Sequence, residues 1–149
     1  LNSMVANKLN FSFHSYKLGK TPEDPRSKII PARRMVKLEN LLPFNPICTS
    51  TVMIRREIPP STQFKVNLRR RQDYVFWYEF IKKNGSAHGI NDILGYYRTG
   101  LKKSLSSNKI KNAFIQYNIL RRHFKVGVLR SIYFTTLYSI NGLTKYYAK

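Results

Sequence analysis

The sequence predicts an α/β fold, because segments with strand-like alternation occur beside segments with helical spacing. Residues 9–16 alternate apolar with polar side chains and place Phe11 and Phe13 on one side of a predicted strand. Residues 49–54 are β-branched and apolar, which is typical of a buried strand. The run that begins at Asp73 is apolar on nearly every side, which indicates a buried helix.

Short connecting segments are predicted between these elements. Three prolines among residues 21–31 predict a loop or a hairpin. Residues 36–42 predict a short helix that ends before Pro43, because the residue before a proline disfavours helical backbone. Residues 59–61, Pro-Pro-Ser, predict another loop.

The buried helix is predicted over residues 73–83, and the pair Asn84–Gly85 is a typical helix end. Helical spacing places on one face of this helix Tyr74, Trp77, Tyr78 and Ile81. Residues 87–90 and 93–97 then predict two short strands.

Two amphipathic helices are predicted in the C-terminal part of the sequence. One face of the first carries Ile110, Phe114, Tyr117 and Phe124. Gly127 separates it from the second helix, whose periodic positions are Leu129, Ile132, Tyr133, Leu137, Ile140 and Thr144. No apolar run in the sequence reaches the length of a membrane span.

The charge of the chain is its clearest compositional feature. A formal net charge of +20 over 149 residues predicts an anionic partner or surface. No acidic residue follows Asp92, whereas that span carries Arg98, Lys102, Lys103, Lys109, Lys111, Arg121, Arg122, Lys125, Arg130, Lys145 and Lys149. The single cysteine, Cys48, excludes an internal disulfide.

Four motifs follow one another along the chain. They are Asn-Pro-Ile-x-Thr-Ser-Thr-Val-Met from Asn45, Arg-Gln-Asp-Tyr-x-x-Trp from Arg71, Asn-x-x-Leu-x-Tyr-Tyr-Arg from Asn91 and Ser-Leu-Ser-Ser-Asn-Lys from Ser104. In this order the sequence resembles the C-terminal half of a family 2 glycosyltransferase. The resemblance implies a partial GT-A fold, which is Rossmann-like, with a short mixed sheet. It implies that residues 1–108 are the acceptor-side half of a catalytic domain that lacks its nucleotide-binding half, and that residues 109–149 are basic, aromatic helices.

Asp73 is the candidate catalytic residue. An inverting transfer needs a base that takes the proton of the acceptor hydroxyl, and the resemblance places Asp73 at that position. From the residues alone, Asp73 is instead a good N-cap for the following helix. The same motif makes its neighbours Arg71, Gln72 and Trp77 candidates for substrate binding.

Two further groups are candidate substrate contacts. By resemblance, Thr49, Ser50 and Thr51 lie on the acceptor side of the active site; the alternative is that they are ordinary sheet residues. Also by resemblance, Arg98, Ser104 and Ser106 contact the leaving diphosphate, for which guanidinium and hydroxyl groups are suitable donors. The alternative for this second group is a solvated basic loop.

The resemblance implies transfer of a sugar from a nucleotide-sugar donor to a glycan or lipid-linked acceptor, in the synthesis of capsule, O-antigen or lipopolysaccharide. The Gln-x-x-Arg-Trp motif of processive members is absent, so addition of a single sugar is expected. The intact enzyme is expected to use Mg²⁺ or Mn²⁺, but its Asp-x-Asp motif is absent, since Asp24, Asp73 and Asp92 are isolated. The chain also starts at Leu1, so we expect a truncated or partial enzyme without independent activity.

Aromatic side chains alternate with the cations of the C-terminal helices. These aromatic residues are Tyr133, Phe134, Tyr138, Tyr146 and Tyr147. This combination suits the headgroup region of an anionic bilayer, but also single-stranded nucleic acid or two core helices with basic faces. The bilayer is favoured because acceptors of the family are often lipid-linked, which implies a cytoplasmic protein, peripheral on the inner face of a bacterial membrane. The rival functions are a small basic nucleic-acid-binding protein or an inactive fragment. Nucleic acid is disfavoured because the aromatic helix after Asp73 is predicted to be buried.

Overall fold

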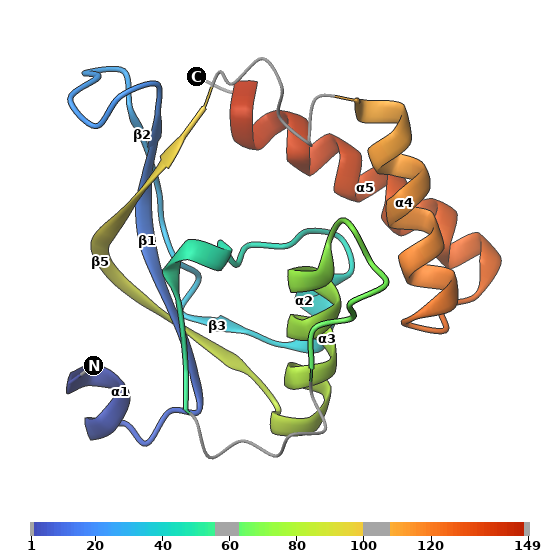
Figure 1. Cartoon of the computed structure of the whole chain (residues 1–149), viewed down its shortest axis with the longest axis horizontal. Coiled ribbons are helices and arrows are strands. Elements are labelled where there is room, and N and C mark those ends of the chain that lie inside the picture. Colours follow the sequence, from blue (N-terminus) through green and yellow to red (C-terminus); the bar gives the residue numbers. More distant parts are fainter. Residues whose placement is uncertain (1, 56–62, 100–107, 148–149) are drawn as a thin grey trace.

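The computed structural model describes residues 2–55, 63–99 and 108–147. A sheet forms one side of the molecule, the helices α2 and α3 lie against it, and the helices α4 and α5 lie beyond α3 (Figure 1). One cluster of buried side chains runs through all three layers. The predicted α/β class, with a short mixed sheet, is confirmed.

The sheet is built around β1 (Phe11–Gly19). On one side β1 pairs antiparallel with β2 (Lys28–Ile30) and with β4 (Val52–Ile54). On the other side it pairs parallel with β5 (Ala87–Arg98), which in turn pairs antiparallel with β3 (Met35–Val36). The sheet is therefore mixed, and β1 is its best-covered strand.

The predicted strand over residues 49–54 is correct only for its second half. Thr49–Thr51 forms the 3-10 turn η1, in which the backbone amide and the hydroxyl of Thr51 both donate to the carbonyl oxygen of Cys48, at 2.9 and 2.8 Å. A hydroxyl that bonds to the local backbone competes with sheet pairing, which accounts for the difference. The strand begins only at Val52.

Two other predictions of secondary structure were partly wrong, whereas the hairpin predicted as one alternative for residues 21–31 is confirmed. Residues 28–30 form β2, which pairs antiparallel with the preceding strand β1. The helix predicted over residues 36–42 is the single turn α2 (Leu38–Leu41). The two strands predicted over residues 87–97 are the one strand β5, whose register against β1 shifts on both sides of Ser15.

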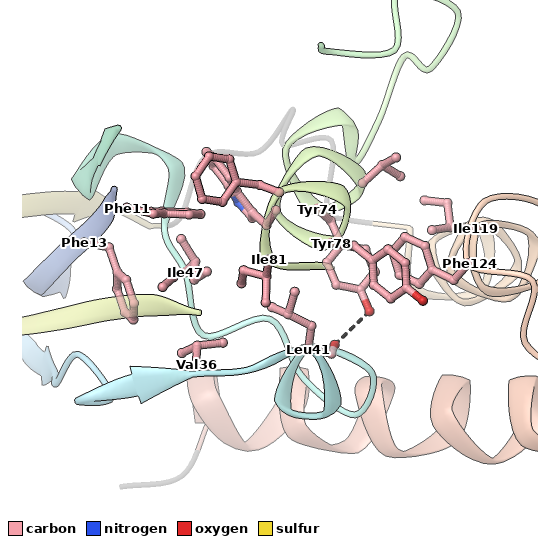
Figure 2. Packing of buried hydrophobic residues seen from close by; sticks show 14 of the residues in the cluster. Phe11, Phe13, Val36, Leu41, Ile47, Tyr74, Tyr78, Ile81, Ile119 and Phe124 are labelled. Carbon is pink, nitrogen blue, oxygen red and sulfur yellow. Dashed lines mark hydrogen bonds between the residues drawn. The ribbon is translucent and has the colours of Figure 1, made fainter. Parts of the chain in front are cut away.

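Helix α3 (Gln72–Asn84) is the centre of the core, as predicted. Trp77 lies 5.0 Å from Phe11 between ring centroids, so the helix packs against β1. The hydroxyl of Tyr74 donates a 2.7 Å hydrogen bond to the carbonyl oxygen of Leu41, which joins α3 to α2 (Figure 2). Gly85 has a φ of 92° and its amide closes the last turn of the helix, so the predicted helix end is confirmed.

Helices α4 (Lys109–Arg122) and α5 (Val128–Tyr147) confirm the two predicted C-terminal helices. The side chains that α4 buries most deeply are Gln116, Ile119 and Leu120. Phe124, just after α4, stacks on Tyr78 with centroids 3.6 Å apart. The core thus includes side chains from both sides of residue 108, and the division into segments 1–108 and 109–149 stays a prediction.

The predicted apolar face of the first C-terminal helix was wrong for Ile110 and Phe114 and correct for Phe124. Ile110 is 86% exposed and Phe114 is 66% exposed, whereas Phe124 is buried. Apolar residues occur on two different faces of this helix. Packing against Tyr74 and Tyr78 of α3 decides which of the two faces is buried. Among the described residues, no helix combines the length and the apolar character needed to cross a membrane.

Candidate functional site

The backbone turns sharply just before α3 and places Asp73 in the first turn of the helix. Arg71 occupies the N-cap position with a φ of 60°, in the left-handed region, and the helix begins at Gln72. The N-cap alternative for Asp73 is therefore wrong. As an acidic residue in the first turn, Asp73 lies near the positive end of the helix dipole.

The carboxylate of Asp73 is held at two points and is partly exposed. Its Oδ2 accepts a 2.7 Å hydrogen bond from the hydroxyl of Thr49. Its Oδ1 accepts a 2.8 Å hydrogen bond from the backbone amide of Tyr74. Each oxygen retains capacity for a further donor, since a carboxylate has about four acceptor positions.

The three hydroxyl residues of η1 divide between two roles. Thr49 is exposed and bonds to Asp73, and Ser50 beside it is also exposed. Thr51 is only 4% exposed, and its hydroxyl bonds to the carbonyl oxygen of Cys48 within the same turn. The structure therefore brings Thr49 to Asp73, while Thr51 holds the turn in shape.

The side chain of Arg71 reaches from the start of α3 to α5. Its guanidinium carbon lies 4.4 Å from the ring centroid of Tyr138, at cation–π distance. Burial raises the pKa of Tyr138, and the positive charge of Arg71 opposes that rise. Sequence reasoning missed Tyr138 as part of this site, because periodicity did not show that it faces α3.

Buried polar groups fasten this end of α3 to its surroundings. Tyr74 lies 5.7 Å from Tyr138 between ring centroids, and its hydroxyl accepts a 3.3 Å hydrogen bond from Nε2 of Gln116. Burial raises the pKa of Tyr74. The side chain of Gln72 donates a hydrogen bond to the carbonyl oxygen of Leu68 and so fixes the preceding loop to the helix. These contacts hold the first turn of α3, which carries Asp73, in a fixed position.

A groove of about 350 Å³ lies between that preceding loop and the start of α4. Its walls are formed by Asn67, Leu68, Arg69, Arg70, Lys111 and Ile115. Arg70 donates a 3.0 Å hydrogen bond to the side chain of Asn112 across it. Three cationic side chains line the groove, which suits an anionic group of a ligand. The prediction of site residues missed this groove, because Arg69 and Lys111 are far apart in the sequence.

Other predicted site residues do not contact Asp73. Trp77 is 2% exposed and lies among the rings of Phe11, Phe64 and Phe76. Arg98 is exposed at the end of β5, and this end of the strand is separated from the first turn of α3 (Figure 1). Ser104 and Ser106 lie outside the described residues.

Within residues 2–55, 63–99 and 108–147, no group of three or more His, Cys, Asp or Glu side chains could hold a metal ion. Asp73 has a hydroxyl and an amide, rather than other carboxylates, as its nearest polar neighbours.

Two relatives match most of the chain. It is 36% identical over 128 residues, 83% of the chain, to TuaG of Bacillus subtilis (strain 168), which is named as a teichuronic acid biosynthesis glycosyltransferase. It is 31% identical over 147 residues, 98% of the chain, to an uncharacterized glycosyltransferase of Haemophilus influenzae. No family model and no solved structure matches the chain.

These matches cover 50% of TuaG and 57% of the Haemophilus protein, so the chain spans about half the length of the curated relatives it matches. The predicted resemblance to glycosyltransferases is confirmed by both relatives, and TuaG is the one whose name refers to teichuronic acid biosynthesis. The mixed α/β architecture agrees with a partial Rossmann-like glycosyltransferase domain.

Proposed function

We propose that this chain, a relative of glycosyltransferases, supplies the acceptor-side chemistry of an enzyme that builds a cell-surface polysaccharide. The reaction is transfer of a sugar from a nucleotide-sugar donor to a glycan or a lipid-linked acceptor. The observation that carries the proposal is the partly exposed carboxylate of Asp73, which Thr49 and the start of α3 hold in one orientation. The names of the two relatives support the reaction class.

In this proposal Asp73 is the general base. An acceptor hydroxyl within hydrogen-bond reach of the carboxylate gives up its proton as its oxygen attacks the anomeric carbon of the donor sugar. The bond from that carbon to the diphosphate breaks on the opposite side, so the anomeric configuration inverts. The Thr49 hydroxyl keeps one carboxylate oxygen in place and leaves a lone pair of the carboxylate for the acceptor.

Cationic groups near this turn would contact the anionic parts of the substrates. The groove lined by Arg69, Arg70 and Lys111 lies next to the loop that Gln72 fixes to α3. It suits a phosphate or carboxylate group, because a guanidinium binds either in a bidentate manner. Arg98, with Ser104 and Ser106, is the remaining candidate for contacts with the leaving diphosphate.

The described residues do not fit a divalent metal, because no cluster of three ligating side chains exists among them. No step of the proposed mechanism is therefore routed through a metal. The proposed location is the cytoplasmic side of the membrane, where nucleotide sugars and lipid-linked acceptors meet. Nucleic acid binding has less support, because Tyr74, Trp77 and Tyr78 of α3 are buried and cannot stack on bases.

The test is the stereochemistry of transfer by a version of the protein that also includes the region by which its relatives are longer. Transfer from a nucleotide sugar, with the product's anomeric configuration opposite to that of the donor, is the expected result. Retention of configuration would contradict the role of Asp73 as a base, since a retaining transfer does not proceed by direct attack of this kind. Binding of single-stranded RNA in place of sugar transfer would favour the rival function.

A further inference from the structure

The inward side of helix α5 carries polar residues beside the aromatic side chains of Phe134 and Tyr138, which pack against the core. Ser131 is fully buried, and its hydroxyl donates a 2.9 Å hydrogen bond to the carbonyl oxygen of Gly127. The side-chain amide of Asn141 donates a 3.2 Å hydrogen bond to the carbonyl oxygen of Pro43, and Tyr138 lies under Arg71. These residues recur at helical spacing and define the inward side of α5.

The outward side of the same helix is apolar. Leu129 is 82% exposed, Ile132 is 53%, Tyr133 is 59% and Ile140 is 51% exposed. The spacing of these residues places them in one stripe, opposite to Ser131 and Tyr138. A surface helix of a soluble domain typically places polar residues on its outward side, so a second apolar stripe that faces outward is unusual. The stripe of Leu129, Ile132, Tyr133 and Ile140 is therefore a contact surface for a partner.

The polar side chains in or beside this stripe are satisfied within the helix. The hydroxyl of Thr136, between Ile132 and Ile140, donates a 3.1 Å hydrogen bond to the carbonyl oxygen of Ile132. The hydroxyl of Ser139 donates a 2.9 Å hydrogen bond to the carbonyl oxygen of Thr135. Neither hydroxyl therefore needs water as a partner, which lowers the cost of placing this side of α5 in an apolar medium.

The charge of the residues around the stripe indicates which kind of partner can bind to it. No acidic residue follows Asp92 in the sequence, and α5 carries the exposed cation Arg130 beside Leu129. A second copy of this chain, with its own net charge of +20, would bring like charges together. An anionic surface with an apolar interior satisfies both features at once.

We propose that the outward side of α5 lies in the interfacial region of an anionic phospholipid bilayer. The helix lies along the surface, with Leu129, Ile132, Tyr133 and Ile140 toward the acyl chains and Arg130 at the headgroups. This inference rests on the proposed function and adds to it the surface through which the enzyme would bind the membrane. On the opposite side of α5, Tyr138 contacts Arg71, which lies at the start of α3 close to Asp73. The position of α5 on the bilayer would therefore determine the distance of Asp73 from the membrane surface.

The test is co-sedimentation of the 149-residue chain with vesicles of phosphatidylcholine alone or mixed with phosphatidylglycerol. The variant Leu129→Gln/Ile132→Gln removes two of the four apolar side chains of the stripe without changing charge. A matched control is Ile93→Gln/Leu94→Gln, which makes the same chemical change at two exposed positions of β5. Circular dichroism and thermal unfolding check that both variants fold.

The wild-type chain and the control variant are expected to bind the mixed vesicles. The α5 variant is expected to bind with a partition constant lower by roughly tenfold or more. Equal binding by all three proteins would overturn the proposal, because the attraction would then be electrostatic alone. Self-association that the α5 variant abolishes, without vesicle binding, would assign the stripe to a second copy instead.

This measurement involves no sugar transfer, so its outcome is independent of the role of Asp73. Loss of vesicle binding with normal transfer to a soluble acceptor would remove only the membrane inference. Vesicle binding without any transfer by the lengthened protein would remove only the proposed enzymatic function.

Discussion

The hydroxyl of Thr49 donates a 2.7 Å hydrogen bond to Oδ2 of Asp73, and thereby joins the turn η1 to the first turn of α3. The two residues are 24 positions apart in the sequence. Because Oδ1 is also bonded to the amide of Tyr74, the carboxylate cannot rotate without breaking one of the two contacts. The orientation of Asp73 thus depends on a side chain from a separate segment.

Thr49→Val should lower kcat of the lengthened enzyme while leaving donor binding intact. A hydrogen bond to a charged group contributes roughly 1.5–3 kcal/mol, which corresponds to about a ten- to hundredfold change in rate if it is fully expressed in the transition state. The matched control is Thr49→Ser, which retains the hydroxyl and should recover most of the activity. An unchanged kcat in Thr49→Val would show that this contact does not orient the base.

Substitution of Trp77 tests whether this side chain is a core residue or a substrate contact. Its ring lies among Phe11, Phe64 and Phe76, and its Nε1 has no hydrogen-bond partner among the described residues. Trp77→Ala should therefore reduce the free energy of unfolding by about 3–5 kcal/mol, and Trp77→Phe by about 1–2 kcal/mol. Urea denaturation gives both values. A stable Trp77→Ala protein that has lost acceptor binding would instead place Trp77 in the binding site.

Alkaline pH should destabilise the fold through Tyr74. Burial raises the pKa of Tyr74 in the folded protein above its ordinary value of 10.0. The unfolded chain therefore loses this proton first, and the free energy of unfolding falls as pH rises above about 10. In Tyr74→Phe this fall should be shallower, with Tyr138 and Tyr78 accounting for the remainder, since burial raises the pKa of each.

Tyr74→Phe also has a consequence at neutral pH. It leaves the carbonyl oxygen of Leu41 and the side chain of Gln116 without the Tyr74 hydroxyl, so it should cost about 1–3 kcal/mol of unfolding free energy. Chemical denaturation at pH 7 and at pH 10.5 or so separates the two effects. An identical pH slope in the two proteins would contradict the ionisation argument.

The groove beside the α3 turn should bind multivalent anions. Arg69→Gln/Lys111→Gln should weaken pyrophosphate binding to the chain by roughly tenfold, and binding to the wild-type chain should fall as salt is added. The control Lys37→Gln/Lys82→Gln removes the same charge at exposed positions outside the groove. Isothermal titration measures all three proteins. Equal losses in both variants would show that only net charge matters.

The pattern of apolar and polar residues was sufficient to predict those helices and strands whose formation depends on the residues within them. The apolar run after Asp73 gave the buried helix, and the alternation around Phe11 and Phe13 gave the central strand. Pairing between distant segments was not predictable, and for this reason the parallel pairing of β1 with β5 was not predicted. In α4, apolar residues occur on more than one face, and only packing in the core selects the face that includes Ile119 and Leu120.

The candidate site was predicted in the same uneven way. The sequence indicated Asp73 and Thr49, but not that they touch, because η1 bends where a strand was expected. Arg71 was named without its partner Tyr138, because the aromatic pattern of α5 did not show which rings face the core. The stripe of Leu129, Ile132, Tyr133 and Ile140 was assigned helical periodicity, but its exposure became evident only in the structure.

Asp73 is the residue on which the proposed reaction depends most, and the most direct measurement is the single-turnover rate of sugar transfer by Asp73→Asn in the lengthened enzyme. Asparagine keeps the size of the side chain and can still accept from Thr49, but it cannot take a proton. We expect a rate lower by about 10²–10⁴-fold, with unchanged affinity for the nucleotide sugar. Transfer at the wild-type rate by Asp73→Asn would contradict the assignment of Asp73 as the base.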